Sequence, residues 1–176
     1  MTAATPHAVD HSPRRYLPLL TAIVAVTVDA LPLPTAAPGN VAPLFTLCVL
    51  FYWALWEPRL LTPAGTFATG LLYDLLCGMP AGHSALAFVA TRLLLGPRYA
   101  YLRVQPFAII WLCFALAAAL VEWLRWLLAC LWWWHLFPVL PVLAEYLLTV
   151  ASWPLVSYLL FWVRAALPRP RYGERS

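Results

Sequence analysis

The chain alternates between long apolar blocks and short segments that carry Pro, Gly or Arg. A helix needs roughly 20 apolar residues to cross a bilayer, and fewer where flanking side chains reach the surface or the bilayer thins. Six blocks come near this length. We therefore expect transmembrane helices at approximately 16–33, 41–56, 63–78, 84–101, 106–131 and 138–163.

These blocks predict an all-α fold, a polytopic membrane helical bundle with about six transmembrane helices. We expect one transmembrane domain at 16–163, between a cytoplasmic N-terminal tail at 1–15 and a basic cytoplasmic C-terminal tail at 164–176.

Composition supports a membrane location and excludes a soluble domain. Of the 176 residues, 64% are hydrophobic and 10% are charged, which is more apolar surface than a soluble fold can hide. Every basic residue is Arg, and most Arg residues flank the apolar blocks, so the pattern is not that of a nucleic-acid site.

The four cysteines stand singly, and we interpret them as packing residues rather than metal ligands. We expect no metal and no cofactor. The cysteines are Cys48, Cys77, Cys113 and Cys130.

The distribution of Arg predicts the orientation. Arg residues precede the first block, follow the sixth, and lie between the second and third and between the fourth and fifth. Short cytoplasmic loops retain positive charge, whereas translocated loops lose it. We therefore expect both termini in the cytoplasm of a bacterium, and the Arg-free connections 34–40, 79–83 and 132–137 on the outer side of the inner membrane.

Aromatic residues fit this frame, because Trp and Tyr settle at the two membrane interfaces. We interpret them as lipid-facing belts. Three consecutive Trp residues mark the outer interface: Trp132, Trp133 and Trp134. Five residues mark the inner one: Trp53, Trp56, Tyr99, Tyr101 and Trp162.

Six ionisable residues fall inside the predicted helices, where each costs free energy unless it is paired, hydrated or near an interface. They are Asp29, Asp74, Arg92, Glu122, Arg125 and Glu145. All except Arg92 lie in the outer half, and Glu122 and Arg125, three residues apart, can pair. Two interpretations stay open: an outward-facing polar cavity that binds a ligand or a partner's charged segment, or residues satisfied by head groups and helix ends.

Arg92 lies about 12 Å into the fourth predicted helix, counted at the rise of an α-helix. Gly96 and Pro97 follow it, and they predict that this helix bends or breaks. The Arg92 side chain either extends to the inner surface or pairs with Asp74.

The most specific stretch of the sequence runs from Gly70 to Leu86 and reads GLLYDLLCGMPAGHSAL. Its Gly and Pro residues predict a tight turn between two helices, with Ser84 as the N-cap of the second. Gly70 lies one turn before Asp74 and lets a neighbouring helix approach closely. The Asp74 carboxylate can accept backbone N–H groups of the turn or of the next helix.

This stretch, with the pattern G-L-L-x-D-L-L-x-G-x-P-x-G-x-x-A-L, resembles the signature of the rod shape-determining protein MreD family. The residues that carry the resemblance are Gly70, Asp74, Gly78, Pro80, Gly82, Ala85 and Leu86. Pro43, Tyr52-Trp53 and Pro58 are similar to the second helix and turn of that family. The resemblance implies a fold similar to the S-component fold of energy-coupling-factor transporters.

The resemblance also implies a noncatalytic scaffold in the bacterial cell-elongation complex that builds lateral peptidoglycan. Its expected partners are MreC directly, the glycosyltransferase RodA and its transpeptidase, MreB filaments indirectly, and membrane lipid.

Two other function classes stay open. The first is a substrate-binding membrane subunit of a vitamin-type transporter, which would use the outer polar residues. The second is a membrane enzyme with Asp74 and Glu122 as an acid/base couple. The sequence contains no metal-ligand spacing, nucleophile elbow or Gly-rich phosphate loop that would support an enzyme.

Overall fold

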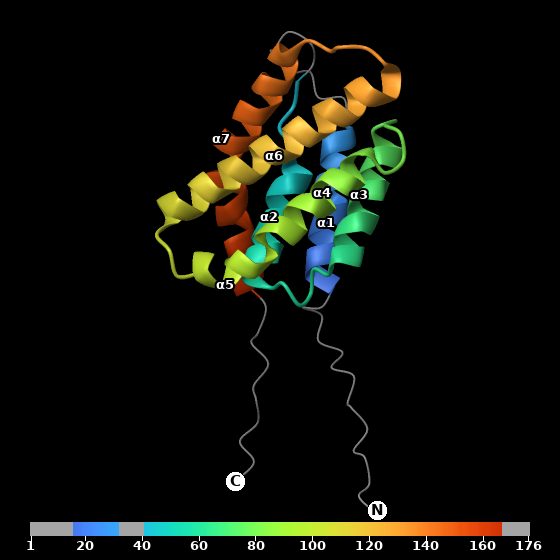
Figure 1. Ribbon diagram of the computed structural model, residues 1–176. Helices are drawn as coiled ribbons and strands as arrows, with labels where there is room; N and C mark the ends of the chain where they lie inside the picture. The colour runs from blue at the N-terminus through green and yellow to red at the C-terminus, as the bar shows by residue number, and fades with distance from the viewer. Residues whose placement is uncertain (1–15, 32–40, 167–176) are drawn as a thin grey trace, which may run out of the picture.

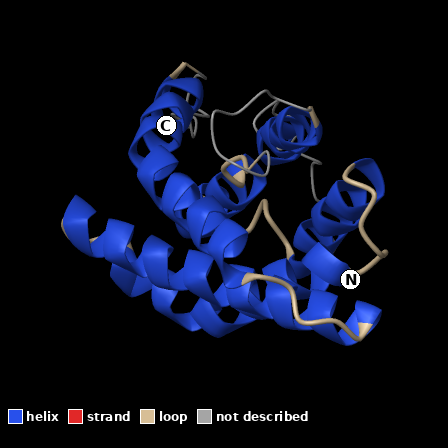
Figure 2. Ribbon diagram, turned by 90° about the horizontal axis from the view of Figure 1, so that it is seen from above, coloured by secondary structure: helices blue, strands red, loops and turns tan. Residues whose placement is uncertain are grey.

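The computed structural model describes residues 16–31 and 41–166, and within these ranges all regular structure is helical (Figures 1 and 2). The predicted all-α class is therefore confirmed. The α-helices are α1 (Leu17–Ala30), α2 (Phe45–Trp56), α3 (Pro63–Leu76), α4 (His83–Leu95), α5 (Tyr99–Leu102), α6 (Phe107–Trp133) and α7 (Val139–Ala165), with a 3-10 turn, η2 (Gly96–Arg98), between α4 and α5. The predicted tails and the predicted outer turn at 34–40 lie in whole or in part outside the described residues.

Helix α2 forms the centre of the bundle. It is apolar on all sides, and its residues from Thr46 to Leu55 are all buried, as expected for a helix surrounded by others. It packs against α1 and α7, and its Phe51 ring meets the rings of Phe114 and Trp153 edge-on at 5.3 and 5.2 Å. Phe114 and Trp153 stack on each other at 4.4 Å, so aromatic packing joins α2, α6 and α7.

Two aromatic residues predicted for the inner lipid-facing belt belong to this core instead. Trp53 and Tyr99 are each 3% exposed. The indole N–H of Trp53 donates to the hydroxyl of Thr21 at 2.8 Å, which holds α2 against α1. The belt prediction was wrong for these two residues because periodicity cannot distinguish the lipid side of a uniformly apolar helix from its protein side. Trp56 is half-buried, and Tyr101 and Trp162 are exposed.

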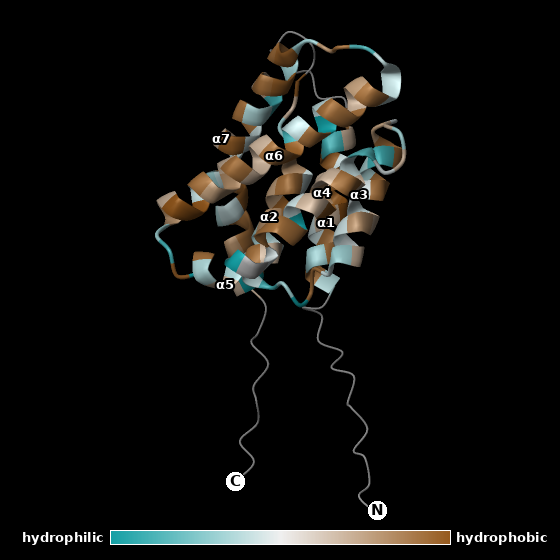
Figure 3. Cartoon of the chain, viewed as in Figure 1, coloured by the Kyte–Doolittle hydropathy of each residue, from teal (hydrophilic) through white to brown (hydrophobic). Residues whose placement is uncertain are grey.

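Apart from α5, which has four residues, the α-helices divide into four short ones and two long ones. The first four have 12 to 14 residues, which corresponds to about 18–21 Å, less than the roughly 30 Å of a bilayer's hydrocarbon core. Helices α6 and α7 have 27 residues each, or about 40 Å, and within the described ranges these two are long and apolar enough to cross a membrane. Figure 3 shows that hydrophobic residues cover most of their length.

The second and fourth predicted helices are shorter than expected for identifiable reasons. Residues 41–44 are not helical, and the buried N–H of Leu44 donates to the hydroxyl of Thr149 in α7 at 2.9 Å. The fourth helix breaks at Gly96, as its Gly96-Pro97 pair predicts, and the chain continues through η2 into α5.

Five Arg residues lie at one end of the bundle, which we call the arginine end. The Arg92 guanidinium donates to the carbonyls of Pro58 and Leu61 at 3.1 and 2.8 Å. The Arg103 guanidinium donates a hydrogen bond to the Leu55 carbonyl, and Arg164 forms an ion pair with Glu57 at 3.2 Å. Arg59 and Arg98 complete the set.

Arg92 therefore extends to the connection between α2 and α3 and does not pair with Asp74. The start of α1 and the end of α7 lie at this same end (Figure 1). We call the opposite end, which carries the α3–α4 and α6–α7 connections, the turn end.

Candidate functional site at the turn end

Asp74 organises the turn between α3 and α4. Its carboxylate is fully buried and accepts the backbone N–H groups of Gly82 at 3.0 Å and of Ser84 at 2.9 and 3.1 Å, with a longer bond from Ala85 at 3.4 Å. The first N–H groups of a helix have no partner within the helix and carry partial positive charge. Asp74 therefore satisfies the start of α4 from the end of α3, as its place in the sequence predicts.

The backbone of the turn corrects one detail of the prediction. The N-cap of α4 is Gly82, with φ +97°, and not Ser84, which lies inside the helix. Gly78 ends α3 with φ +69°, and both values lie in the left-handed region that Gly adopts without strain. Ser84 takes part through its backbone N–H, which donates to Asp74. The Asp74 carboxylate therefore has the capping role that was expected of the Ser84 hydroxyl.

Gly70 and Ala85 mark the closest approach of α3 and α4. A Cβ at Gly70 would lie 2.9 Å from the backbone nitrogen of Ala85 and 3.0 Å from its Cβ, and closer still to its Cα. Ala85 is completely buried in this contact. The small residues thus bring the start of α4 within reach of Asp74 one turn further along α3.

Asp29 performs the same capping between α1 and α2. Its two carboxylate oxygens accept the backbone N–H groups of Phe45 at 3.0 Å and Thr46 at 2.8 Å, at the start of α2. Like Asp74, it lies in the last turn of one short helix and holds the first turn of the next. In both hairpins, therefore, an aspartate in the last turn of one helix caps the first turn of the next.

Arg125 gathers the other two acids of the predicted polar cluster. Its guanidinium lies 2.9 Å from Glu145 of α7 and 3.4 Å from Glu122 of α6, and it is 3.4 Å from the hydroxyl of Tyr73 in α3. Arg125 and Glu122 are 8% and 4% exposed. The structure thus joins α3, α6 and α7 through one buried cation.

The six predicted cluster residues form three separate groups in the structure. Two acids cap helices, two acids surround Arg125, and Arg92 lies at the arginine end. Every hydrogen bond recorded for the Asp74 carboxylate comes from a backbone N–H rather than from Glu122.

A groove of about 460 Å³ lies beside the α3–α4 turn. Pro80, Gly82 and Leu86 of the sequence signature line one wall, and Trp132 and Trp134 at the end of α6 line the other. Trp134 ends α6 in the left-handed conformation, with φ +50°, and is 89% exposed. The turn that Asp74 fixes is therefore also one side of an apolar, aromatic surface at the turn end.

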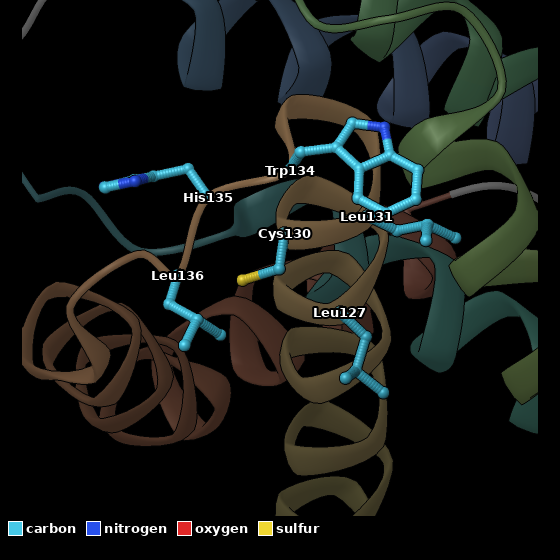
Figure 4. Close-up of a pocket in the computed structure, with 6 residues that line it drawn as sticks. All are labelled: Leu127, Cys130, Leu131, Trp134, His135 and Leu136. Carbon is cyan, nitrogen blue, oxygen red and sulfur yellow. The ribbon is translucent and has the colours of Figure 1, made fainter.

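Figure 4 shows a second hollow, of about 410 Å³, around the end of α6. Trp134 and Leu131 extend toward one side of α6, whereas Cys130 and Leu136 lie toward the other. The ring of His135 points away from the Cys130 thiol, so the two do not form a nucleophile and base pair. In residues 16–31 and 41–166, no group of three His, Cys, Asp or Glu side chains is placed to hold a metal ion.

Two residues of the site were not predicted from the sequence. Tyr73 precedes Asp74 in the signature, and its ring lies 5.5 Å from the Arg125 guanidinium. Thr149 binds the start of α2 and, through its own hydroxyl, the carbonyl of Glu145 at 2.7 Å. Both lie in apolar runs where no local pattern distinguishes them. The four-residue spacing of Glu145 and Thr149, one helical turn, was the one signal in the sequence that could have pointed to Thr149.

Comparison with protein families gives one match, to the model described as rod shape-determining protein MreD, over residues 14–164. Comparisons with curated proteins and with solved structures gave no significant match. The match covers most of the chain and includes the whole Asp74 hairpin, and the apolar helices agree with the membrane location of such a protein. The chain belongs to the MreD family of rod shape-determining membrane proteins.

Proposed function

We propose that the protein is a noncatalytic scaffold of the bacterial cell-elongation complex and that it supports lateral peptidoglycan synthesis by binding MreC directly. RodA, its transpeptidase and MreB filaments would join through MreC. The single observation that best supports this proposal is the family match over residues 14–164.

The geometry of the turn end adds physical support. Asp74 fixes the α3–α4 turn through backbone N–H groups, and Arg125 joins α3 to α6 and α7. Such buried polar contacts fix the shape of the surface around them. Removing one partner of such a contact costs much of the protein's stability. The groove beside Trp134 is therefore a preformed apolar surface, which suits a protein partner better than a reaction.

We infer a six-span topology with both termini in the cytoplasm. Helices α1 to α4 are too short to cross a full bilayer alone, but they pack against each other and against the long α6 and α7, which shields their ends. The gathering of five Arg residues at one end supports placing that end in the cytoplasm. A C-terminal green fluorescent protein fusion should fluoresce, and a C-terminal alkaline phosphatase fusion should be inactive.

Depletion in the host tests the proposed function. Cells that lose the protein should become rounded or swollen, and re-expression should restore rods. Affinity purification from gently solubilised membranes should recover MreC. Normal rods after depletion, in a strain without a second copy of the gene, would overturn the proposal.

A transporter subunit is less well supported by the site. Asp29 and Asp74 accept backbone N–H groups at helix N-termini, and the two glutamates pair with Arg125. The groove at the turn end is lined mainly by apolar side chains. Neither arrangement offers open polar groups to a vitamin-like molecule.

A further inference from the structure

A second groove, at the arginine end, lies between the first turns of α6 and the second half of α7. Its volume is about 430 Å³, and its lining includes Tyr52 and Trp56 of α2, Phe107 of α6, and Trp153, Phe161 and Arg164 of α7. Figure 1 shows the first turns of α6 leading away from the end of α7, so the two helices diverge there. The groove therefore opens where the first turns of α6 separate from the second half of α7.

A proline lies inside α7 at the level of the groove. This residue, Pro154, has no N–H to give to the carbonyl of Val150, four residues earlier. The indole N–H of Trp111 in α6 donates to that carbonyl at 3.0 Å. Helices α6 and α7 are thus tied together at this level, and the groove extends from Pro154 toward the C-terminal end of α7.

Charge and polarity are unequally distributed along the groove. Its deep part is aromatic, and Ser157 there satisfies its hydroxyl on the carbonyl of Pro154 at 3.0 Å. At the mouth, the Arg164 guanidinium lies 5.3 Å from the Trp56 ring and 3.2 Å from Glu57. Arg103 bonds the neighbouring Leu55 carbonyl, and Arg59 follows two residues after Glu57. Arg164 and Arg103 outnumber Glu57 near the mouth, and the rest of the lining is mainly apolar and aromatic.

We propose that this groove binds one anionic phospholipid, with an acyl chain along the aromatic interior and the phosphate at Arg164. Basic pockets between transmembrane helices on the cytoplasmic side suit anionic head groups. The planar guanidinium of Arg164 keeps its contacts with Glu57 and Trp56 and adds a positive charge and N–H donors at the place where a phosphate would lie.

Native mass spectrometry of the full chain tests this proposal. The protein is reconstituted in vesicles of equal phosphatidylglycerol and phosphatidylcholine, extracted gently, and examined for retained lipid. We expect one retained phosphatidylglycerol in preference to phosphatidylcholine. Arg164→Gln should reduce this preference about tenfold, as expected for the loss of one charge-assisted contact. The matched control Arg98→Gln, which removes an Arg of the same end outside the groove, should leave the preference unchanged.

A second variant tests the apolar half of the groove. Ser157→Phe fills the interior without changing charge, and it should reduce retention of both lipids. Equal retention of the two lipids by the unaltered protein would overturn the proposal, and this result does not depend on any variant folding. Equal effects of Arg164→Gln and Arg98→Gln, or unchanged retention in Ser157→Phe, would also overturn it. The groove lies at the end opposite the proposed partner surface, so a failure here leaves the scaffold proposal standing.

Discussion

The Asp74 carboxylate at the end of α3 holds the backbone N–H of Ser84, at the start of α4, between its two oxygens at 2.9 and 3.1 Å. The contact crosses the tight turn of the family signature and is fully buried. It makes α3 and α4 one structural unit, whose turn forms a wall of the groove at the turn end.

Asp74→Ala should destabilise the protein by about 2–4 kcal/mol, because it leaves several buried N–H groups without an acceptor. Ser84→Ala is the matched control. The Ser84 hydroxyl has no hydrogen-bond partner among the described residues, so its removal should change stability by less than about 0.5 kcal/mol. Thermal unfolding in detergent measures both effects. If Ser84→Ala were as damaging as Asp74→Ala, the hydroxyl and not the carboxylate would be the cap.

Gly70→Ala should destabilise the protein by about 1–3 kcal/mol, because the added methyl group overlaps the backbone of Ala85. Gly65→Ala, in the same helix, is the control. Its new Cβ would meet the Thr62 hydroxyl at an ordinary 3.4 Å, and the better helix propensity of Ala offsets any loss. Equal stabilities of the two variants would contradict the close approach of α3 and α4.

Arg125→Gln should destabilise the protein by about 3–5 kcal/mol, because Glu122 and Glu145 then face each other without a buried cation. Adding Glu122→Gln removes one of the two charges. The double variant should therefore be more stable than the sum of the two single effects predicts, by about 0.5–3 kcal/mol. Unfolding measurements on the four members of this double-mutant cycle give the coupling, and strict additivity would exclude a buried ion pair.

Arg92→Leu and Asp74→Asn should have additive effects, to within about 0.5 kcal/mol. Arg92 bonds carbonyls at the arginine end, whereas Asp74 bonds N–H groups at the turn end, so neither variant changes the surroundings of the other. Unfolding of the two single variants and the double variant tests this. A coupling above about 1 kcal/mol would indicate the direct pair that the sequence left open.

The sequence was sufficient for those features that depend on local chemistry. The Gly and Pro residues between Gly78 and Gly82 predict the turn, Gly96-Pro97 predicts the break after α4, and the position of Asp74 predicts a capping carboxylate. Each of these follows from the backbone preferences of Gly and Pro or from the positive end of a helix.

Other features depend on which helices are neighbours, and a uniformly apolar chain gives little information about that. Trp53 was assigned to the lipid interface although α1 covers it. Thr149 and Tyr73 acquire their contacts from residues 105 and 52 positions away in the chain. The short length of α2 also depends on a neighbouring helix, because the backbone N–H of the nonhelical Leu44 donates to Thr149 of α7.

The most direct test of the scaffold account is photo-crosslinking in native membranes from two exposed positions at opposite ends of the bundle. A photoreactive residue in place of Ala81, in the turn beside the groove, should capture MreC, and the same residue in place of Ala100, in α5, should not. The yield from position 81 should fall in an Asp74→Asn background at equal protein level. Equal capture of MreC from both positions, or capture of an ATPase module from position 81, would contradict the account.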